Sequence, residues 1–313
     1  MVNLKVGSLF SGIGGIDLGF RQAGYEIAFA NEIDKNACIT YMHNFKNGNL
    51  TEGDIQNIDA AILPDIDILV AGFPCQPFSV CGKQNGFSDN RGNAFFEIMR
   101  IADTKHPQII FLENVANLAE HDNGRTFNRI YNELAKRDYI IRYIVADACN
   151  HGIPQHRTRI YIVAFKKIRA SQLFTFPKET TAITSIWDYI DRSVKATDTL
   201  YLNPIDKDFE RMHSFIKDNR QIYRFADFGI QAGKNELAFT LKANMGTYPN
   251  RIPIIKDNFG IRKLSPNECL ILQGFPTDFT FPNIPANQAY KQAGNTVCVP
   301  IIKAIAKNLA SLY

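Results

Sequence analysis

Cys75 lies in a proline-rich loop whose surroundings suit a nucleophile. The loop reads Gly72-Phe-Pro-Cys-Gln-Pro-Phe-Ser79 and directly follows the apolar run from Asp67 to Phe73. A cysteine kept only for packing usually sits inside an apolar run, whereas prolines on both sides hold Cys75 in a constrained loop. We therefore predict that Cys75 is a thiol nucleophile, with a buried structural cysteine as the alternative.

Glu113 is the carboxyl group that we expect beside this thiol. It follows the apolar run 108–112. A carboxyl group at the end of a buried strand is partly desolvated, which favours its protonated form and a proton-donating role. If both apolar runs are strands of one sheet, Glu113 and Cys75 meet at the sheet edge where such folds bind ligands. The alternative role for Glu113 is a structural ion pair.

A glycine-rich turn and two acidic residues predict a nucleoside-binding site. The turn Phe10-Ser-Gly-Ile-Gly-Gly15 ends the first apolar run, and Glu32 ends the second. Glycine allows close backbone approach to a ligand, and an acid about 20 residues further on typically binds ribose hydroxyls. Asp17 replaces the third glycine of the dinucleotide fingerprint, and its charge favours a cationic ligand such as S-adenosylmethionine over a pyrophosphate. Asp54 is expected beside the adenine ring, or else is an exposed loop aspartate.

Short apolar runs alternate with helical patterns over the first ~165 residues, which predicts an α/β fold with a parallel sheet and helices on both faces. The expected strands are 4–10, 25–30, 67–73, 108–112, 139–145 and 160–165, and the expected helices are 16–20, 34–44 and 93–102. Periodicity is weak from 166 to 281, and a helical pattern returns over 287–313. We predict one discontinuous domain, 1–172 and 283–313, and a second irregular domain, 173–282.

Composition narrows the class of protein. The 313 residues are 45% hydrophobic and 21% charged, which is typical of a soluble globular protein. The sequence shows neither an apolar run long enough to span a membrane nor a cleaved signal, so we expect a cytoplasmic protein. Six cysteines without a Cys-x-x-Cys spacing predict neither a zinc site nor disulfides, and most should be buried. Residues 166–262 hold sixteen Lys and Arg against eleven Asp and Glu, which indicates a polyanionic partner or a chance excess.

Eight motifs, read in order, give the chain a family resemblance. It resembles the bacterial C5-cytosine-specific DNA methyltransferases of type II restriction-modification systems. The fold implied is the Rossmann-like sheet of S-adenosylmethionine-dependent methyltransferases with a smaller target-recognition domain. The motifs are Phe10–Gly15, Asn31–Asp34, Gly53–Ile55, Gly72–Ser79, Glu113–Val115, Gln155–Arg159, Arg262–Pro276 and Gln292–Val297.

The resemblance implies a reaction and a role for each matching residue. A target cytosine would be flipped out of duplex DNA, Cys75 would add to its C6, and C5 would take a methyl group from S-adenosylmethionine. Glu113 would bind N3 and the amino edge of the cytosine, and Arg159 would bind O2. Arg157 would steady the catalytic loop or neighbouring groups.

The same resemblance implies the ligand contacts and the partners. No metal is expected. The cofactor-binding residues would be Phe10, Ser11, Gly12, Gly14, Glu32, Ile33, Asp54, Ile55, Pro74, Asn295 and Val297. The DNA-binding residues would be Gln76, Ser79, Thr240, Asn244 and Arg251, with 243–251 as a loop for the major groove or an ordinary surface loop. The expected protein is a prokaryotic, cytoplasmic monomer that binds double-stranded DNA and is paired in function with a restriction endonuclease.

Three other functions compete with this hypothesis. An RNA cytosine methyltransferase of the same fold would keep the cofactor and cysteine motifs. A catalytically silent DNA-binding relative would lack the cysteine or the acid, and both are present here. An NAD oxidoreductase is opposed by Asp17 and by the cysteine loop.

Overall fold

The computed structural model describes residues 4–46, 48–73, 93–180, 184–247 and 251–312. Contacts within the chain define two compact units. The first contains Met1–Asp147, Thr158–Lys178 and Val299–Tyr313, and the second contains Ala148–Arg157 and Glu179–Cys298. The segment 283–298, which we predicted to belong with the first domain, has its contacts in the second unit.

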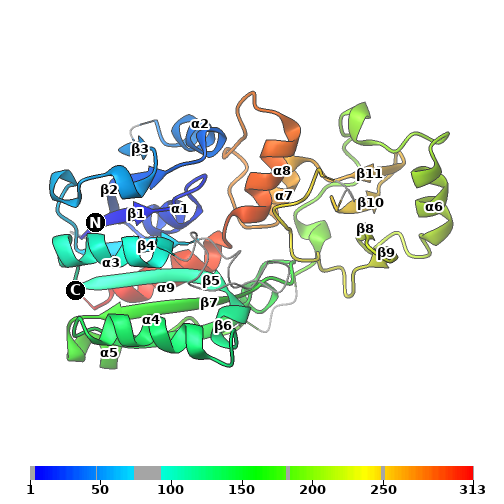
Figure 1. The fold of residues 1–313 in the computed structure, drawn as a ribbon. Helices are drawn as coiled ribbons and strands as arrows, with labels where there is room; N and C mark the ends of the chain where they lie inside the picture. The colour runs from blue at the N-terminus through cyan, green and yellow to red at the C-terminus, as the bar shows by residue number, and fades with distance from the viewer. Residues whose placement is uncertain (1–3, 47, 74–92, 181–183, 248–250, 313) are drawn as a thin grey trace. The chain divides into compact units, whose positions relative to one another are not determined.

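The first unit is built on a seven-stranded sheet with the order β3-β2-β1-β4-β5-β7-β6 (Figure 1). Five neighbouring strands are parallel, and β7 runs antiparallel to both β5 and β6. The strands are β1 Lys5–Leu9, β2 Glu26–Glu32, β3 Leu50–Glu52, β4 Ile68–Gly72, β5 Ile109–Val115, β6 Ile140–Asp147 and β7 Thr158–Phe165.

The expected α/β class is therefore confirmed, but the prediction of a purely parallel sheet was wrong. Parallel neighbours need a crossover connection of about a dozen residues or more, usually with a helix. The segment 148–157 between β6 and β7 is shorter than that and has only the 3-10 turn Ala148–His151. It therefore returns the chain in the opposite direction.

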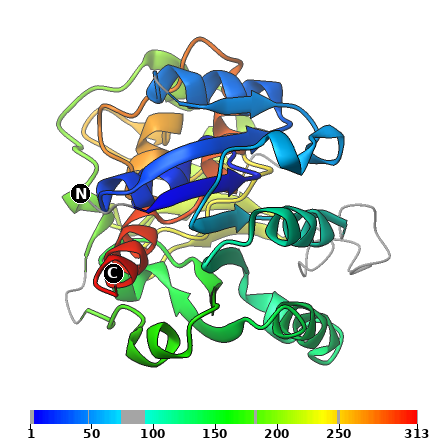
Figure 2. The same ribbon diagram turned by 90° about the vertical axis from the view of Figure 1, so that its left-hand side faces the viewer.

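Helices cover both faces of this sheet, as the sequence predicted (Figures 1 and 2). On one face, Phe20 of α1 packs against Phe111 with ring centroids 5.7 Å apart, and α9 is fixed there by a hydrogen bond of 3.1 Å from the Tyr25 hydroxyl to the Ala306 carbonyl. On the other face, α3 and α4 pack on residues such as Leu112 in a continuous buried core. The helices of this unit are α1 Gly15–Gln22, α2 Lys35–Asn44, α3 Asn93–Lys105, α4 Arg125–Ala135, α5 Ile168–Leu173 and α9 Val299–Ala310.

The second unit contains a small antiparallel sheet with the order β11-β10-β8-β9. Its strands have three or four residues each, which is too short for an alternating pattern to stand out. For that reason the region looked irregular in the sequence. The elements are α6 Lys207–Phe215, β8 Tyr223–Ala226, β9 Gly229–Ala232, β10 Ile254–Lys256, β11 Ile261–Lys263, α7 Pro266–Ile271 and α8 Ala286–Asn295.

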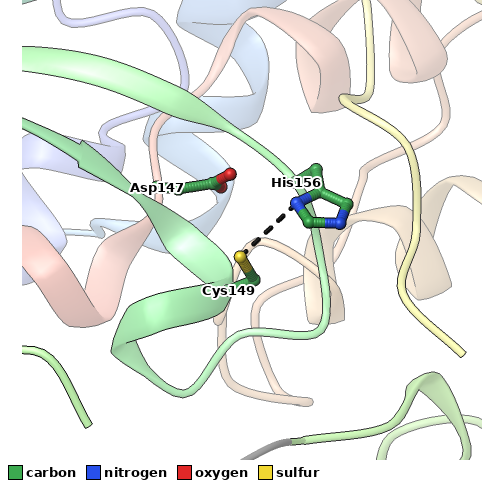
Figure 3. Close-up of side chains that lie close together, drawn as sticks. All are labelled: Asp147, Cys149 and His156. Carbon is green, nitrogen blue, oxygen red and sulfur yellow. Dashed lines mark hydrogen bonds between the residues drawn. The ribbon is translucent and has the colours of Figure 1, made fainter. Parts of the chain in front are cut away.

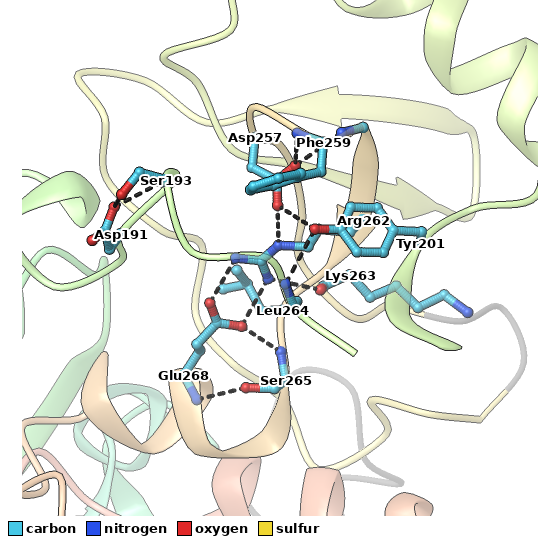
Figure 4. Close-up of polar contacts among 12 residues, drawn as sticks. Asp191, Ser193, Tyr201, Asp257, Phe259, Arg262, Lys263, Leu264, Ser265 and Glu268 are labelled. Atoms are coloured by element: carbon cyan, nitrogen blue, oxygen red, sulfur yellow. Dashed lines mark hydrogen bonds and ion pairs between the residues drawn. The ribbon is translucent and has the colours of Figure 1, made fainter. Parts of the chain in front are cut away.

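A buried arginine organises the second unit around β11 (Figure 4). The Arg262 side chain is 1% exposed; its Nε donates to Asp257 at 2.6 Å, and its two terminal nitrogens donate to Glu268 at 2.8 and 2.9 Å. The Tyr201 hydroxyl also donates to Asp257, at 2.9 Å. Glu268 and Ser265 form the capping box that begins α7. One buried cation therefore ties three segments of this unit together.

Candidate active site

The glycine turn after β1 needs its glycines for two different reasons. Phe10, Gly12 and Gly14 all have positive φ, at 53°, 55° and 88°. A Cβ built on Gly12 would meet nothing within 4 Å, so this glycine borders open space. A Cβ on Gly14 would lie 2.3 Å from the Phe45 ring, so that glycine is required by packing against α2. The Gly14 N–H closes the turn by donating to the Ser11 carbonyl at 2.8 Å.

Glu32 ties this turn to the end of β2. Its carboxylate accepts from the backbone N–H of Gly12 at 2.7 Å and from those of Ile33 and Asp34 at 2.8 Å. A carboxylate has about four acceptor positions, so these three bonds leave it able to accept one more. The Ile33 side chain beside it is 60% exposed, which places apolar surface next to the acid. The Glu32 carboxylate can therefore accept from a ligand hydroxyl, while the Ile33 side chain offers a surface to a flat ring.

Asn31 positions the second acidic loop, a role that the sequence did not reveal. Its side-chain amide donates to the carbonyls of Thr51 and Gly53, each at 3.0 Å. This brings Asp54, which is partly exposed and caps the 3-10 turn Ile55–Asn57, close to the end of β2. The Ile55 side chain is 3% exposed and packs in the core, so it supports the site from behind.

Asp17, whose charge we expected to favour a cationic ligand over a pyrophosphate, is buried within the first unit. Its side chain is 0% exposed and accepts hydrogen bonds from the hydroxyls of Ser8, at 2.5 Å, and Tyr41, at 2.8 Å. Burial raises the pKa of the Asp17 carboxyl to about 6, against the lowering effect of these two donors and of Arg21. The first turn of α1 directs this residue under β1, toward α2.

Glu113 and Arg159 lie together on one face of the sheet. In the β5–β7 ladder Val115 is opposite Arg159, and residues two apart on a strand share a face. Glu113 is therefore a diagonal neighbour of Arg159, and Arg159 Nε is 3.2 Å from Glu113 Oε1. Their side chains are 14% and 10% exposed. Glu113 stands inside β5, which runs to Val115, and not just beyond the strand as the sequence suggested.

The same acid lies next to the start of the cysteine loop. Gly72, the last residue of β4, is paired with Glu113, and a Cβ on Gly72 would be 3.6 Å from Glu113 Oε2. The Asn114 side chain donates to the Phe73 carbonyl at 3.3 Å. Two consecutive residues of β5 thus hold the point where this loop begins. Pro74, Cys75, Gln76 and Ser79 lie outside the described residues.

Arg157 is a positioning residue of the second unit. Its side chain is 2% exposed, and its guanidinium donates to the carbonyls of Leu241, at 3.0 Å, Gly294, at 3.2 Å, and Thr296. A Cβ on Gly294 would lie 2.2 Å from the Lys242 carbonyl, so only glycine fits there. The motif that ends α8 is therefore clamped to the Thr240–Leu241 segment. Beside it, Asn295 is exposed and Val297 is 6% exposed.

The described residues that we expected to contact DNA have defined surroundings. The Thr240 hydroxyl donates to the His156 carbonyl at 2.6 Å. Asn244 is exposed, and its carbonyl accepts from the Thr247 hydroxyl at 2.8 Å. Arg251 binds both oxygens of Asp227, at 2.5 and 2.7 Å. Residues 248–250 of the predicted major-groove loop are not among those described.

Four cysteines lie in the part of the chain that the structure describes, and none of these is in a disulfide. Cys38, Cys269 and Cys298 are buried, as expected for most of the six. Burial, with the charge of nearby acids, raises the pKa of Cys38 to about 12. Cys149 is half-buried, and its sulfur is 3.4 Å from His156 Nδ1 (Figure 3). Cys75 and Cys81 lie in the part of the chain that is not described.

Strand order, the single reversed strand and the glycine turn define an α/β methyltransferase fold. A family model for C-5 cytosine-specific DNA methylases matches residues 4–311. The chain is 46% identical to the type II methyltransferase M.Bsp6I of Bacillus sp. (strain RFL6), over 98% of both proteins. It is 36% identical to the type II methyltransferase M.HhaI of Haemophilus parahaemolyticus, over 99% of this chain and 95% of that one. The chain therefore belongs to the C5-cytosine-specific DNA methyltransferases, and it is an enzyme of the type II kind.

Solved structures agree on the fold. The Spodoptera frugiperda DNMT2 mutant aligns with a TM-score of 0.77 and 22% identity, covering 98% of this chain and 99% of that one. The Entamoeba histolytica methyltransferase EhMeth aligns with a TM-score of 0.76 and 21% identity, covering 98% and 97%. Among the described residues, none of the helices combines the length and the apolar character that a membrane span requires.

Proposed function

We propose that this enzyme flips its target cytosine out of duplex DNA and methylates it through a covalent adduct with Cys75. The observation that carries the proposal is the pair Glu113–Arg159 at the sheet edge, directly beside the β4 end from which the cysteine loop departs. A base inside the duplex exposes neither ring face to a nucleophile, so the reaction requires extrusion.

In this mechanism the Cys75 thiolate bonds to C6, and the electron pair of the C5–C6 double bond becomes available at C5. Glu113 donates a hydrogen bond to N3 and accepts one from the exocyclic amino group, while Arg159 donates to O2. These contacts stabilise the charge that develops on the ring as the sulfur adds. After C5 has gained the methyl group, a base removes the C5 proton and the Cys75 sulfur leaves, which restores the double bond.

The described residues fit S-adenosylmethionine as the methyl donor. Glu32 has acceptor capacity for ribose hydroxyls, and Ile33 offers apolar surface to the adenine ring. Asp54 would accept from the adenine amino group. Gly12 leaves open space where a ligand can approach. The proposed set is completed by Phe10, Ser11, Gly14, Ile55, Pro74, Asn295 and Val297. The bound cofactor supplies an electrophilic methyl group, and the chain's own residues hold and orient it.

Residues 173–282 are proposed to read double-stranded DNA, with Thr240, Asn244 and Arg251 among the contacts. Gln76 and Ser79 of the cysteine loop are proposed as further DNA contacts. Lys and Arg contacts to phosphate provide affinity, and contacts to base edges select the sequence. The type II names of the relatives support a functional partnership with a restriction endonuclease. A cytoplasmic monomer remains our expectation.

A mechanism-based trap tests the adduct directly. Duplex DNA with 5-fluorocytosine at the target keeps a fluorine where the C5 proton must leave, so the adduct should persist and map to Cys75. Labelling of Cys81 would show that Cys81, and not Cys75, forms the adduct, and it would overturn the proposal. Parallel incubation of duplex DNA and tRNA with labelled cofactor separates DNA from RNA methylation, and bisulfite sequencing of expressing cells gives the target sequence.

A further inference from the structure

The glycine turn is backed by a buried polar cluster that the proposed reaction does not use. Asp17 is fully buried and accepts from Ser8 of β1 and from Tyr41 of α2. The Tyr41 ring, itself 0% exposed, fills the space behind the turn: a Cβ on Gly14 would lie 2.9 Å from that ring, and one on Gly48 would lie 2.8 Å from its other edge. The Tyr41 hydroxyl is thus held by Asp17, and the Tyr41 ring packs closely against Gly14 and Gly48.

This arrangement connects the carboxyl group to the turn in two steps. The Tyr41 and Phe45 rings are in tilted contact with centroids 4.5 Å apart, and a Cβ on Gly14 would also meet the Phe45 ring, at 2.3 Å. Gly14 in turn closes the Phe10–Gly15 turn and precedes α1. Any shift of the Tyr41 ring therefore changes the support under Gly14, because a packed interior transmits small displacements.

We propose that Asp17 is a positioning residue whose protonation state sets the affinity of the glycine turn for its nucleoside cofactor. The ionised carboxylate accepts from both hydroxyls at once. Protonation turns one of its oxygens into a donor, so the hydroxyl that faces this oxygen must accept instead of donate. The O–H of that buried hydroxyl, on Ser8 or Tyr41, then loses its acceptor. The turn is fully supported only by the ionised form. This inference rests on the cofactor site proposed above.

The groups around Asp17 set its pKa within the pH range that binding measurements can cover. Burial raises the Asp17 pKa to about 6, opposed by the Ser8 and Tyr41 hydrogen bonds and by the Arg21 charge. Burial and the Asp17 charge together raise the pKa of Tyr41, so the phenol remains a donor. The Arg21 guanidinium lies 4.7 Å from the Phe45 ring centroid, on the same cluster. These are the charged or titratable groups that act on Asp17 within the described structure.

The test is the dissociation constant of the full-length enzyme for S-adenosylmethionine and for S-adenosylhomocysteine, measured by calorimetry from pH 5 to 8. Affinity for both ligands should fall by about tenfold as the pH drops through 6. Asp17→Asn, whose side chain has one acceptor oxygen, should bind weakly with little dependence on pH. Tyr41→Phe removes a donor that lowers the Asp17 pKa, so its midpoint should move to higher pH.

Tyr25→Phe is the matched control, since this buried tyrosine binds the Ala306 carbonyl away from the turn. It should keep the wild-type midpoint. Wild-type binding that is tight but flat from pH 5 to 8 would overturn the inference and leave the cofactor site standing. A pH effect restricted to the sulfonium ligand would also overturn it, because geometric support should serve both ligands. If the wild type bound neither ligand, the cofactor site itself would fail.

Discussion

Arg159 Nε lies 3.2 Å from Glu113 Oε1, on adjacent antiparallel strands of the first unit. The contact exists because β7 is reversed: antiparallel pairing sets Arg159 opposite Val115 and diagonal to Glu113. This pair is the part of the proposed catalytic set that the structure places, and it admits two interpretations. It is a structural ion pair, or it is a preformed receptor for one edge of a pyrimidine.

Glu113→Gln separates the two interpretations. Glutamine keeps the size of the side chain but cannot donate a proton to N3 and pairs weakly with a guanidinium. We expect the single-turnover methylation rate to fall by about 10²- to 10³-fold, with cofactor affinity and urea midpoint close to wild type. A purely structural pair would show the opposite pattern, with lower stability and near-normal turnover for the molecules that remain folded.

Arg159→Lys tests the geometry of the second partner. Lysine keeps the charge but loses the planar fork that binds Glu113 and O2 together. The rate should drop by about tenfold or more at saturating DNA. Arg125→Lys, at an arginine of α4 that is 73% exposed, provides the control and should leave the rate unchanged. Equal rates for both variants would show that Arg159 has no role in the reaction.

Gly294→Ala should destabilise the second unit. The added Cβ would lie 2.2 Å from the Lys242 carbonyl, and backbone cannot move aside as a flexible side chain can. We expect a loss of about 1–3 kcal/mol in the free energy of unfolding, measured in urea. Asn287→Ala, at an exposed position of the same helix, should unfold like the wild type. A stable Gly294→Ala protein would mean that α8 does not approach Lys242 this closely.

Arg262→Met should be among the most damaging substitutions in the second unit. It leaves the Asp257 carboxylate, whose side chain is 0% exposed, without its cation, and such losses cost about 3–5 kcal/mol. Adding Asp257→Asn should recover part of this stability because it removes the fully buried charge, which leaves only the partly exposed Glu268 without its cation. Lys195→Met breaks an exposed ion pair with Asp198 and should keep the wild-type midpoint. Failure of the double variant to recover any stability would contradict the charge-based explanation.

Asp17 should make stability depend on pH. Its pKa is about 6 in the folded protein and 3.8 as the ordinary value, so the folded state binds the proton more tightly. The associated stability is fully present below pH 3.8 and is lost as the pH rises through 6, a change of about 3 kcal/mol. Asp17→Asn should flatten this part of the profile of unfolding free energy against pH. An unchanged slope in the variant would show that Asp17 is not its source.

Sequence patterns located most of the sheet in the first unit. The apolar runs predicted six of its seven strands because buried strands must be apolar on both faces, and β3 was missed because only three residues form it. Motif order also identified the family, which the comparisons confirm. The acids Glu32 and Glu113 stood out because each ends an apolar run. These are local properties, so a linear sequence carries them.

Contacts between distant segments could not be read in that way. The reversal of β7 depends on how the chain returns to the sheet. The contact between Arg159 and Glu113 depends in turn on that reversal. The support of the turn by Ser8, Asp17 and Tyr41 joins three elements, and only burial distinguishes that aspartate from a surface one. The clamp of Arg157 on Leu241 and Gly294 joins residues that are 84 and 137 positions apart in the sequence. Sequence determined which side chains were available for chemistry, and tertiary packing decided which of them face each other, because partnership depends on distance in space.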